Sequence, residues 1–142
     1  MKGIRMQGGI PLQGKVRIQG SKNAALPILA ATLLTNEVSY IQNCPRIADV
    51  HRFVHLLREL GCLVHWQEKG IRVQPGENEE LPCERAEARR MQGEAITGMR
   101  SSLCLLGALL GRCGYVTMEH PGGCVIGERP IDLHIRALQQ MG

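Results

Sequence analysis

A stretch of fourteen residues combines a thiol, a permanent cation and a helix start: PGGCVIGERPIDLH, at positions 121–134. Glycines on both sides of Cys124 let a ligand approach the backbone closely. Arg129 presents a planar fork of donors that suits phosphate or carboxylate. Pro130 is a favourable first residue of a helix, and the free N–H groups at a helix N-terminus attract anions. These residue types predict a reactive thiol beside an anion-binding site.

Two further cations stand where helices are expected to begin. Lys22 and Asn23 precede a largely apolar segment, so a cation and an amide would meet free helical N–H groups and bind phosphate or carboxylate. Arg100 opens a second apolar segment. The less specific alternatives are a solvated lysine beside a helix cap and an ordinary surface arginine. From the residues alone, both alternatives stay open.

The elements that must position these residues alternate between strand and helix patterns, which indicates an α/β fold. Strand patterns cover residues 3–7, 14–19, 37–42, 62–67, 70–74 and 115–119. Helix patterns cover residues 23–34, 47–60, 96–111 and 130–141. A loop is expected at residues 121–128, where glycines flank the thiol. The candidate residues therefore fall at helix starts or in this loop.

The chain contains a divergent internal repeat. Asp49-Val50-His51 at the start of one expected helix recurs as Asp132-Leu133-His134 at the start of the last one. The spacing is roughly 80 residues, which indicates a repeated helix–strand–helix unit.

The cysteines do not indicate a metal site. Six cysteines are present, but none forms a C-x-x-C pair and no histidine stands at zinc-finger spacing. We expect mostly buried, reduced thiols and no bound metal. Cys124 differs from the others because glycines, and not aliphatic residues, surround it.

Composition narrows the class of protein. Hydrophobic residues make up 44% and aromatic residues only 3% of the 142-residue chain, so the core must be aliphatic. No apolar run approaches the roughly 20 residues that span a bilayer, and the first residues do not form a secretory signal, so we expect a cytoplasmic protein without membrane association. The net charge is +4, and the basic residues are interleaved with acidic ones rather than clustered. This pattern favours a small anionic ligand over nucleic acid.

Three motifs, in order along the chain, resemble one enzyme family. They are GSKNAALPILA at residues 20–30, MRSS at 99–102 and PGGCVIGERPIDLH at 121–134. The set is similar to the enolpyruvyl transferases that act on UDP-N-acetylglucosamine (UDP-N-acetylglucosamine 1-carboxyvinyltransferases) in the first committed step of peptidoglycan synthesis. The related shikimate-pathway transferase shares the fold and the early lysine, but it lacks the cysteine loop.

The resemblance implies a role for each candidate residue. Cys124 would be the proton donor and the residue alkylated by the antibiotic fosfomycin. Phosphoenolpyruvate would be bound by Lys22, Asn23 and Arg129. The UDP-sugar would be bound by Arg100, Arg129, Pro130, Ile131, Asp132 and Leu133. Asp132 has an alternative as an acidic first-turn residue, and His134 is expected to be structural. No metal or organic cofactor is implied.

The resemblance also implies an incomplete fold. The family is about three times longer and forms an inside-out α/β barrel from βαβαββ repeats. Residues 1–20 would be strands of the second domain, and residues 21–142 an incomplete first domain with one repeat and most of another. The chain would then be the N-terminal part of a transferase, inactive without the missing C-terminal portion. The alternative is a non-catalytic UDP-sugar-binding module or a split-enzyme half that needs a partner.

Overall fold

The computed structural model describes residues 3–74, 76, 90–92, 94–119 and 130–142, with the backbone alone at residues 90, 94, 95 and 100. The helices within these ranges are all too short or too polar to cross a membrane.

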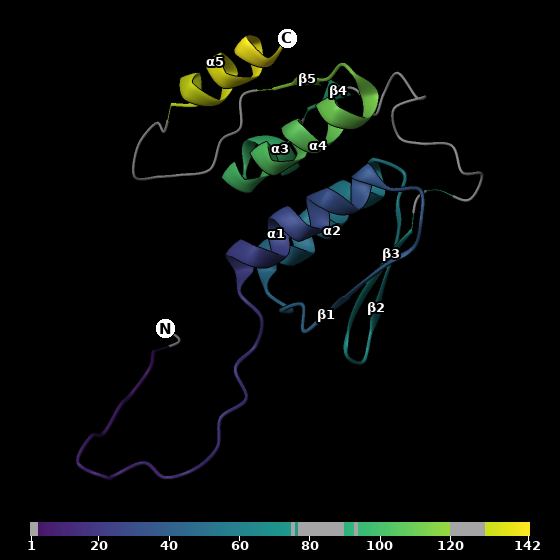
Figure 1. The fold of residues 1–142 in the computed structure, drawn as a ribbon. Coiled ribbons are helices and arrows are strands. Elements are labelled where there is room, and N and C mark those ends of the chain that lie inside the picture. Colours follow the sequence, from purple (N-terminus) through teal and green to yellow (C-terminus); the bar gives the residue numbers. More distant parts are fainter. Residues whose placement is uncertain (1–2, 75, 77–89, 93, 120–129) are drawn as a thin grey trace.

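The first half of the described chain consists of two helices and a small sheet (Figure 1). Its elements are α1 (Lys22–Ala31), the 3-10 turn η1 (Thr32–Leu34), β1 (Ser39–Gln42), α2 (Ala48–Glu59), β2 (Leu63–Gln67) and β3 (Gly70–Gln74). The two helices, the strand and the hairpin expected between residues 23 and 74 are therefore confirmed, with small differences at their ends.

The sheet has the strand order β1–β3–β2, and both neighbouring pairs are antiparallel. Side chains alternate between the two faces of a strand, and the buried face carries Val64, Ile71 and Val73. Val64 lies opposite Val73 in the register of β2 and β3. These apolar side chains give the sheet a single inner face, which packs against the helices.

The second half of the described chain repeats the mixture of helix and strand. Its elements are β4 (Arg90–Met91), α3 (Glu94–Thr97), the 3-10 turn η3 (Arg100–Ser102), α4 (Leu103–Cys113), β5 (Thr117–Met118) and α5 (Asp132–Met141). The short strands β4 and β5 pair in parallel. The expected strand at residues 115–119 and the expected helix at 130–141 are confirmed, and β4 was not expected.

The core is aliphatic around one aromatic ring, as the composition predicts. Phe53 of α2, Leu29 of α1 and Leu105 of α4 are fully buried, and helix α1 contacts both α2 and α4. Burying a side chain of this size contributes about 1.5–3 kcal/mol. Helix α5 has no buried residue and lies beside α4 in Figure 1.

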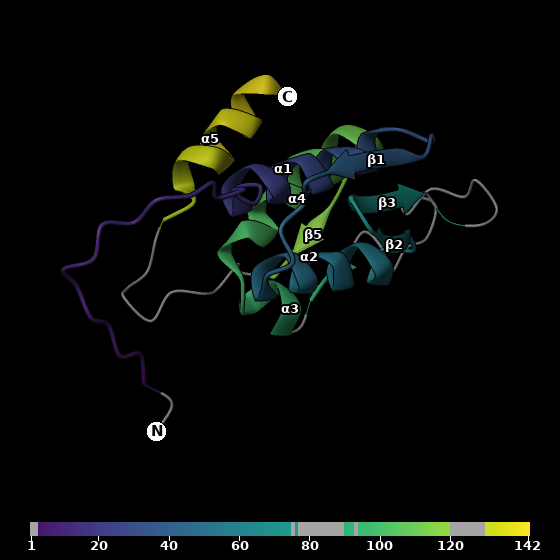
Figure 2. The same cartoon turned by 90° about the horizontal axis from the view of Figure 1, so that it is seen from below.

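Two expectations are wrong for this structure. Residues 3–20 form neither helix nor strand and extend away from the helices in Figures 1 and 2. A strand needs a neighbour for its backbone hydrogen bonds, and no described strand pairs with these residues. The single helix expected at residues 96–111 is broken, because α3 ends at Thr97 and α4 begins at Leu103.

Candidate functional site

A cavity of about 550 Å³ lies where the first turns of four helices meet. Figure 1 shows the N-terminal ends of α1, α2, α4 and α5 on the same side of the molecule. The residues that line the cavity are Lys22, Asn23, Leu26, Asp49, Arg52, Gly98, Met99, Ser101, Leu103, Cys104 and His134. Free N–H groups and the helix dipoles make such a place favourable for anions.

Helix α1 contributes the predicted pair Lys22 and Asn23 to this cavity. The helix begins directly after Ser21, whose carbonyl accepts a hydrogen bond from Ala25 N at 2.9 Å. Just before it, a side chain at Gly20 would collide with the carbonyl oxygen of Asn43. The glycine therefore lets the chain pack closely against the end of β1 and fixes where α1 starts.

Helix α2 contributes two charged residues from its first turn, Asp49 and Arg52. Asp49 Oδ2 lies 2.8 Å from Lys22 Nζ, and Asp49 Oδ1 lies 4.0 Å from Arg52 Nη1. The carboxylate stands between two cations, so these three side chains together carry a net positive charge. Neither Asp49 nor Arg52 was among the site residues predicted from sequence, although the Asp49–Asp132 repeat marked the position of Asp49.

The segment before α4 forms the next wall, through Gly98, Met99 and Ser101. Ser102 is fully buried, and its hydroxyl donates to Met99 O at 2.7 Å and to Ile96 O at 3.1 Å. These bonds hold the turn between α3 and α4 in place. The backbone of Arg100 belongs to this turn, next to the residues that line the cavity. The structure describes only the backbone of this residue.

Helix α5 closes the cavity through His134. His134 was expected to be structural; its side chain is exposed and lines the cavity, which makes it a further candidate site residue. The predicted residues Pro130, Ile131, Asp132 and Leu133 come just before it, and Leu133 is 72% exposed. These four are not among the residues that line the cavity.

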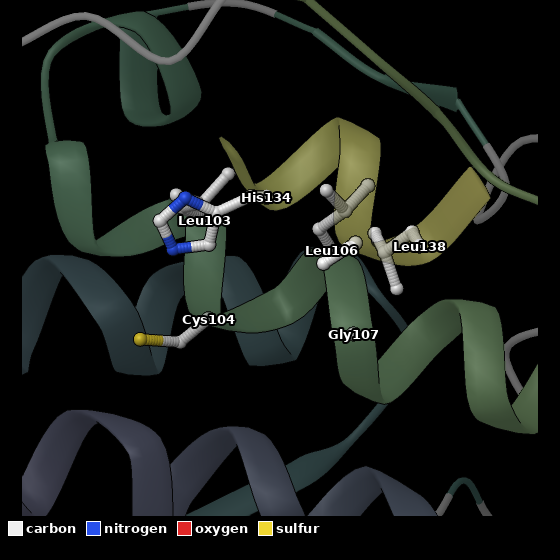
Figure 3. A pocket seen from close by; sticks show the side chains of 7 residues that line it. Leu103, Cys104, Leu106, Gly107, His134 and Leu138 are labelled. Carbon is white, nitrogen blue, oxygen red and sulfur yellow. The ribbon is translucent and has the colours of Figure 1, made fainter. Parts of the chain in front are cut away.

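A second, apolar cavity of about 370 Å³ separates α4 from α5. Figure 3 shows Leu106 of α4 near Leu138 of α5, with the ring of His134 beside Leu103 and above Cys104. Cys104 and His134 line both cavities. The helix that carries the predicted UDP-sugar residues therefore rests on α4 without filling the space between them.

Burial suppresses the acidity of several described thiols. It raises the pKa of Cys62 to about 11, and it also raises the pKa of Cys44 and Cys104. Because the thiolate is the nucleophile, such thiols are unreactive at neutral pH. Within the described residues, no group of three or more His, Cys, Asp or Glu side chains is placed to hold a metal ion.

The structure thus brings together one part of the predicted site. Lys22 and Asn23 meet the turn that contains Arg100 and helix α5, whose first residues are Asp132 and Leu133. Cys124 and Arg129 lie outside the described residues. The residues that sequence reasoning missed, Asp49, Arg52 and His134, come from helix starts that approach the cavity only in the folded chain.

Comparison with known proteins confirms the family that the motifs resemble. The profile of the family described as EPSP synthase (3-phosphoshikimate 1-carboxyvinyltransferase) matches residues 6–142. A UDP-N-acetylglucosamine 1-carboxyvinyltransferase of Methylacidiphilum infernorum is 42% identical over 142 residues, which is 100% of this chain and 32% of the relative. Proteins of the same name from Coprothermobacter proteolyticus and Akkermansia muciniphila are 44% and 41% identical, and 31% of each is covered.

The whole chain therefore matches these curated relatives, and it spans about a third of their length. It belongs to the EPSP synthase (3-phosphoshikimate 1-carboxyvinyltransferase) family, a family of carboxyvinyl-transferring enzymes.

Proposed function

We propose that the chain is the N-terminal part of an enzyme that transfers the enolpyruvyl group of phosphoenolpyruvate to the 3-hydroxyl of UDP-N-acetylglucosamine. Phosphate is released, and the product enters peptidoglycan synthesis in the cytoplasm. The observation that carries the proposal is the cavity at the four helix starts, which contains Lys22 and Asn23. The names of the relatives that match the whole chain supply the UDP-sugar and the carboxyvinyl group, and the resemblance of the motifs supplies phosphoenolpyruvate as the donor.

The charge of the cavity suits both substrates, because each carries phosphate. Lys22 and Arg52 outnumber Asp49 among the charged residues that line it, and the helix starts add partial positive charge. The adjacent apolar wall of Met99 and Leu103 suits the uncharged face of a sugar or a base. A cavity of this composition favours a phosphorylated ligand over a neutral or cationic one.

In the proposed reaction the sugar 3-hydroxyl oxygen bonds to the carbon of phosphoenolpyruvate that carries the phosphate. Cys124 gives a proton to the neighbouring methylene carbon. The hydroxyl proton is lost, and the tetrahedral adduct then expels phosphate and loses a proton from its methyl group. Lys22, Asn23 and Arg129 hold the phosphate, while Arg100 and residues 130–133 hold the UDP-sugar. A thiol suits the proton transfer because its reference pKa of about 8.5 is lowered by nearby positive charge.

We expect the 142-residue chain to bind ligand without turnover. It spans about a third of its relatives, so the remaining walls of the cleft must come from further sequence or from a partner chain. Misplacing catalytic groups by about 1 Å can already cost about a hundredfold in rate. The second candidate function is a non-catalytic UDP-sugar-binding module or half of a split enzyme that needs a partner.

The test is a fusion in which the remaining two thirds of the Methylacidiphilum infernorum relative follow Gly142. We expect phosphate release from phosphoenolpyruvate that depends on UDP-N-acetylglucosamine. Cys124→Ala should abolish this release while leaving UDP-sugar affinity within about threefold of the parent, and fosfomycin should add its mass to Cys124 alone. Full activity in the Cys124→Ala fusion would overturn the catalytic assignment. UDP-sugar binding without turnover in the parent fusion would favour the binding module.

A further inference from the structure

One carboxylate in the cavity is shared by two cations from different places in the chain. Asp49 Oδ2 accepts a hydrogen bond from Lys22 Nζ at 2.8 Å, across 27 residues of sequence. Its other oxygen, Oδ1, faces Arg52 Nη1 at 4.0 Å. All three residues line the same cavity, so the ion pairs belong to the candidate site and not to a distant surface.

The backbones that carry this group are held by the core. Helix α1 contacts α2, and Leu26, Val50 and Phe53 are buried in the same apolar cluster. What remains free is the lysine side chain, which carries roughly 2 kcal/mol of rotamer entropy. A fixed acceptor on α2 selects the rotamers of Lys22 that place its ammonium at the cavity wall.

We infer that Asp49 is a positioning residue for Lys22, which it holds ready for a phosphate group bound in the cavity. Arg52 offsets the charge of Asp49, so that the carboxylate orients the lysine without cancelling the positive charge of the site. The inference rests on the proposed function in so far as the phosphate belongs to phosphoenolpyruvate.

The competing explanation is an ordinary surface salt bridge. The side chains of Lys22 and Asp49 are 46% and 35% exposed, and exposed pairs contribute only about 0–1 kcal/mol to stability. A carboxylate without an orienting role only repels a phosphate in the same cavity, so its removal would leave phosphate affinity unchanged or raise it. The two explanations therefore differ in phosphate binding, whereas both allow a small change in stability.

Helix α2 offers a matched control for the loss of one carboxylate. Glu59 lies at the end of α2 opposite to Asp49, where its Oε1 is 3.5 Å from His55 Nδ1. It does not line the cavity. Asp49→Asn and Glu59→Gln each remove one negative charge from the same helix. Asp49→Glu keeps the charge and tests whether a longer carboxylate restores the contact.

The experiment titrates the 142-residue chain and the three variants with phosphoenolpyruvate and with inorganic phosphate by calorimetry. We expect Asp49→Asn to weaken the binding of both probes by about tenfold, because a charge-assisted contact that orients the ligand's partner is lost. Asp49→Glu should recover most of the affinity, and Glu59→Gln should match the parent. The rate of acetylation of Lys22 relative to the exposed Lys69, followed by peptide mass, should rise in Asp49→Asn alone.

The outcomes separate the two proposals. Unchanged affinity for both probes in Asp49→Asn, or an unchanged acetylation rate of Lys22, would overturn the role of Asp49 and leave the proposed function standing. Binding of inorganic phosphate that depends on Asp49, without any binding of phosphoenolpyruvate, would overturn the proposed function and support the positioning role. A parent chain that binds neither probe overturns both.

Discussion

At the scale of single residues, the thiol group of cysteine has different roles in different surroundings. Burial raises the pKa of Cys44, Cys62 and Cys104, so these thiols stay protonated and serve as small apolar side chains. Cys124 lies outside the described residues, and in the sequence glycines rather than aliphatic residues surround it, so we expect a more accessible and more reactive thiol than a buried one. The contrast predicts that thiol-directed reagents discriminate sharply between Cys124 and Cys62.

The buried thiol of Cys62 makes stability depend on alkaline pH. Its pKa is raised from 9.0 to about 11 in the folded chain. Between these two pH values the thiol is ionised in the unfolded chain and protonated in the folded chain, so rising pH favours unfolding. Stability is unaffected below pH 9 and falls as the pH rises from 9 through about 11, and the fall between pH 8 and pH 11 is about 2 kcal/mol. Chemical unfolding at pH 8 and pH 11 should show this loss in the parent chain, and the loss should be smaller by that amount in Cys62→Ala. Equal losses in both would contradict it.

Some residues of the candidate site could be predicted from the sequence, and others could not. The residues alone left Lys22 and Asn23 open between a site and a helix cap, the resemblance assigned them to the site, and the cavity contains both. Asp49 and Arg52 were missed because their importance comes from a contact between α1 and α2 across 27 residues. His134 was assigned to structure alone, since its spacing does not reveal that α5 turns it toward α4 (Figure 3).

At the scale of elements, the break between α3 and α4 shapes the site. Apolar periodicity continues through residues 96–111, which is why a single helix was expected there. The buried hydroxyl of Ser102 instead donates to the carbonyls of Ile96 and Met99, and side-chain bonds of this kind compete with helical hydrogen bonding. The resulting turn presents Gly98 and Ser101 to the cavity.

Replacing Ser102 tests whether this turn depends on its hydroxyl. Ser102→Ala removes the bonds of the hydroxyl to two carbonyls that keep their backbone donors, Met99 N and Ser102 N, and should lower the free energy of unfolding by about 0.5–1.5 kcal/mol. Ser101→Ala is the matched control, because Ser101 is only partly buried, and it should change stability by less than about 0.5 kcal/mol. Urea unfolding of the three proteins measures both effects. A Ser102→Ala chain as stable as the Ser101→Ala chain would show that packing alone holds the turn.

Elements with local patterns were predictable, and elements with distant partners were not. The β2–β3 hairpin and helix α2 follow from alternation and helical spacing within a few residues. Strands were also expected at residues 3–7 and 14–19, where alternation is just as clear, yet no described strand pairs with them. Alternation specifies which face of a strand is apolar, whereas pairing requires a neighbour that the pattern does not contain.

At the scale of the whole molecule, the exposed apolar surface is concentrated at one end. Ile4, Met6, Leu12, Val16 and Ile18 are each at least 82% exposed, in the segment that extends away from the helices (Figure 2). Exposed apolar side chains in such a contiguous segment mark a surface that another part of a protein covers. The relatives are about three times longer, so we propose that residues 1–20 pair with sequence equivalent to the remainder of those proteins.

Limited digestion with trypsin tests this pairing. In the 142-residue chain we expect cleavage at Lys15 and Arg17 well before cleavage at Arg58, because residues 3–20 form no backbone ladder whereas Arg58 lies in α2 and donates to Val64 O at 2.7 Å. In the fusion with the remainder of the Methylacidiphilum infernorum relative, cleavage at Lys15 and Arg17 should slow by at least about tenfold. Paired backbone must leave its sheet before trypsin can cut it, and an opening free energy of about 1.4 kcal/mol already slows cleavage tenfold. A fusion in which Val16→Asp and Ile18→Asp remove the apolar face should regain fast cleavage. Equal rates in the chain and the fusion would overturn the proposed pairing of residues 1–20.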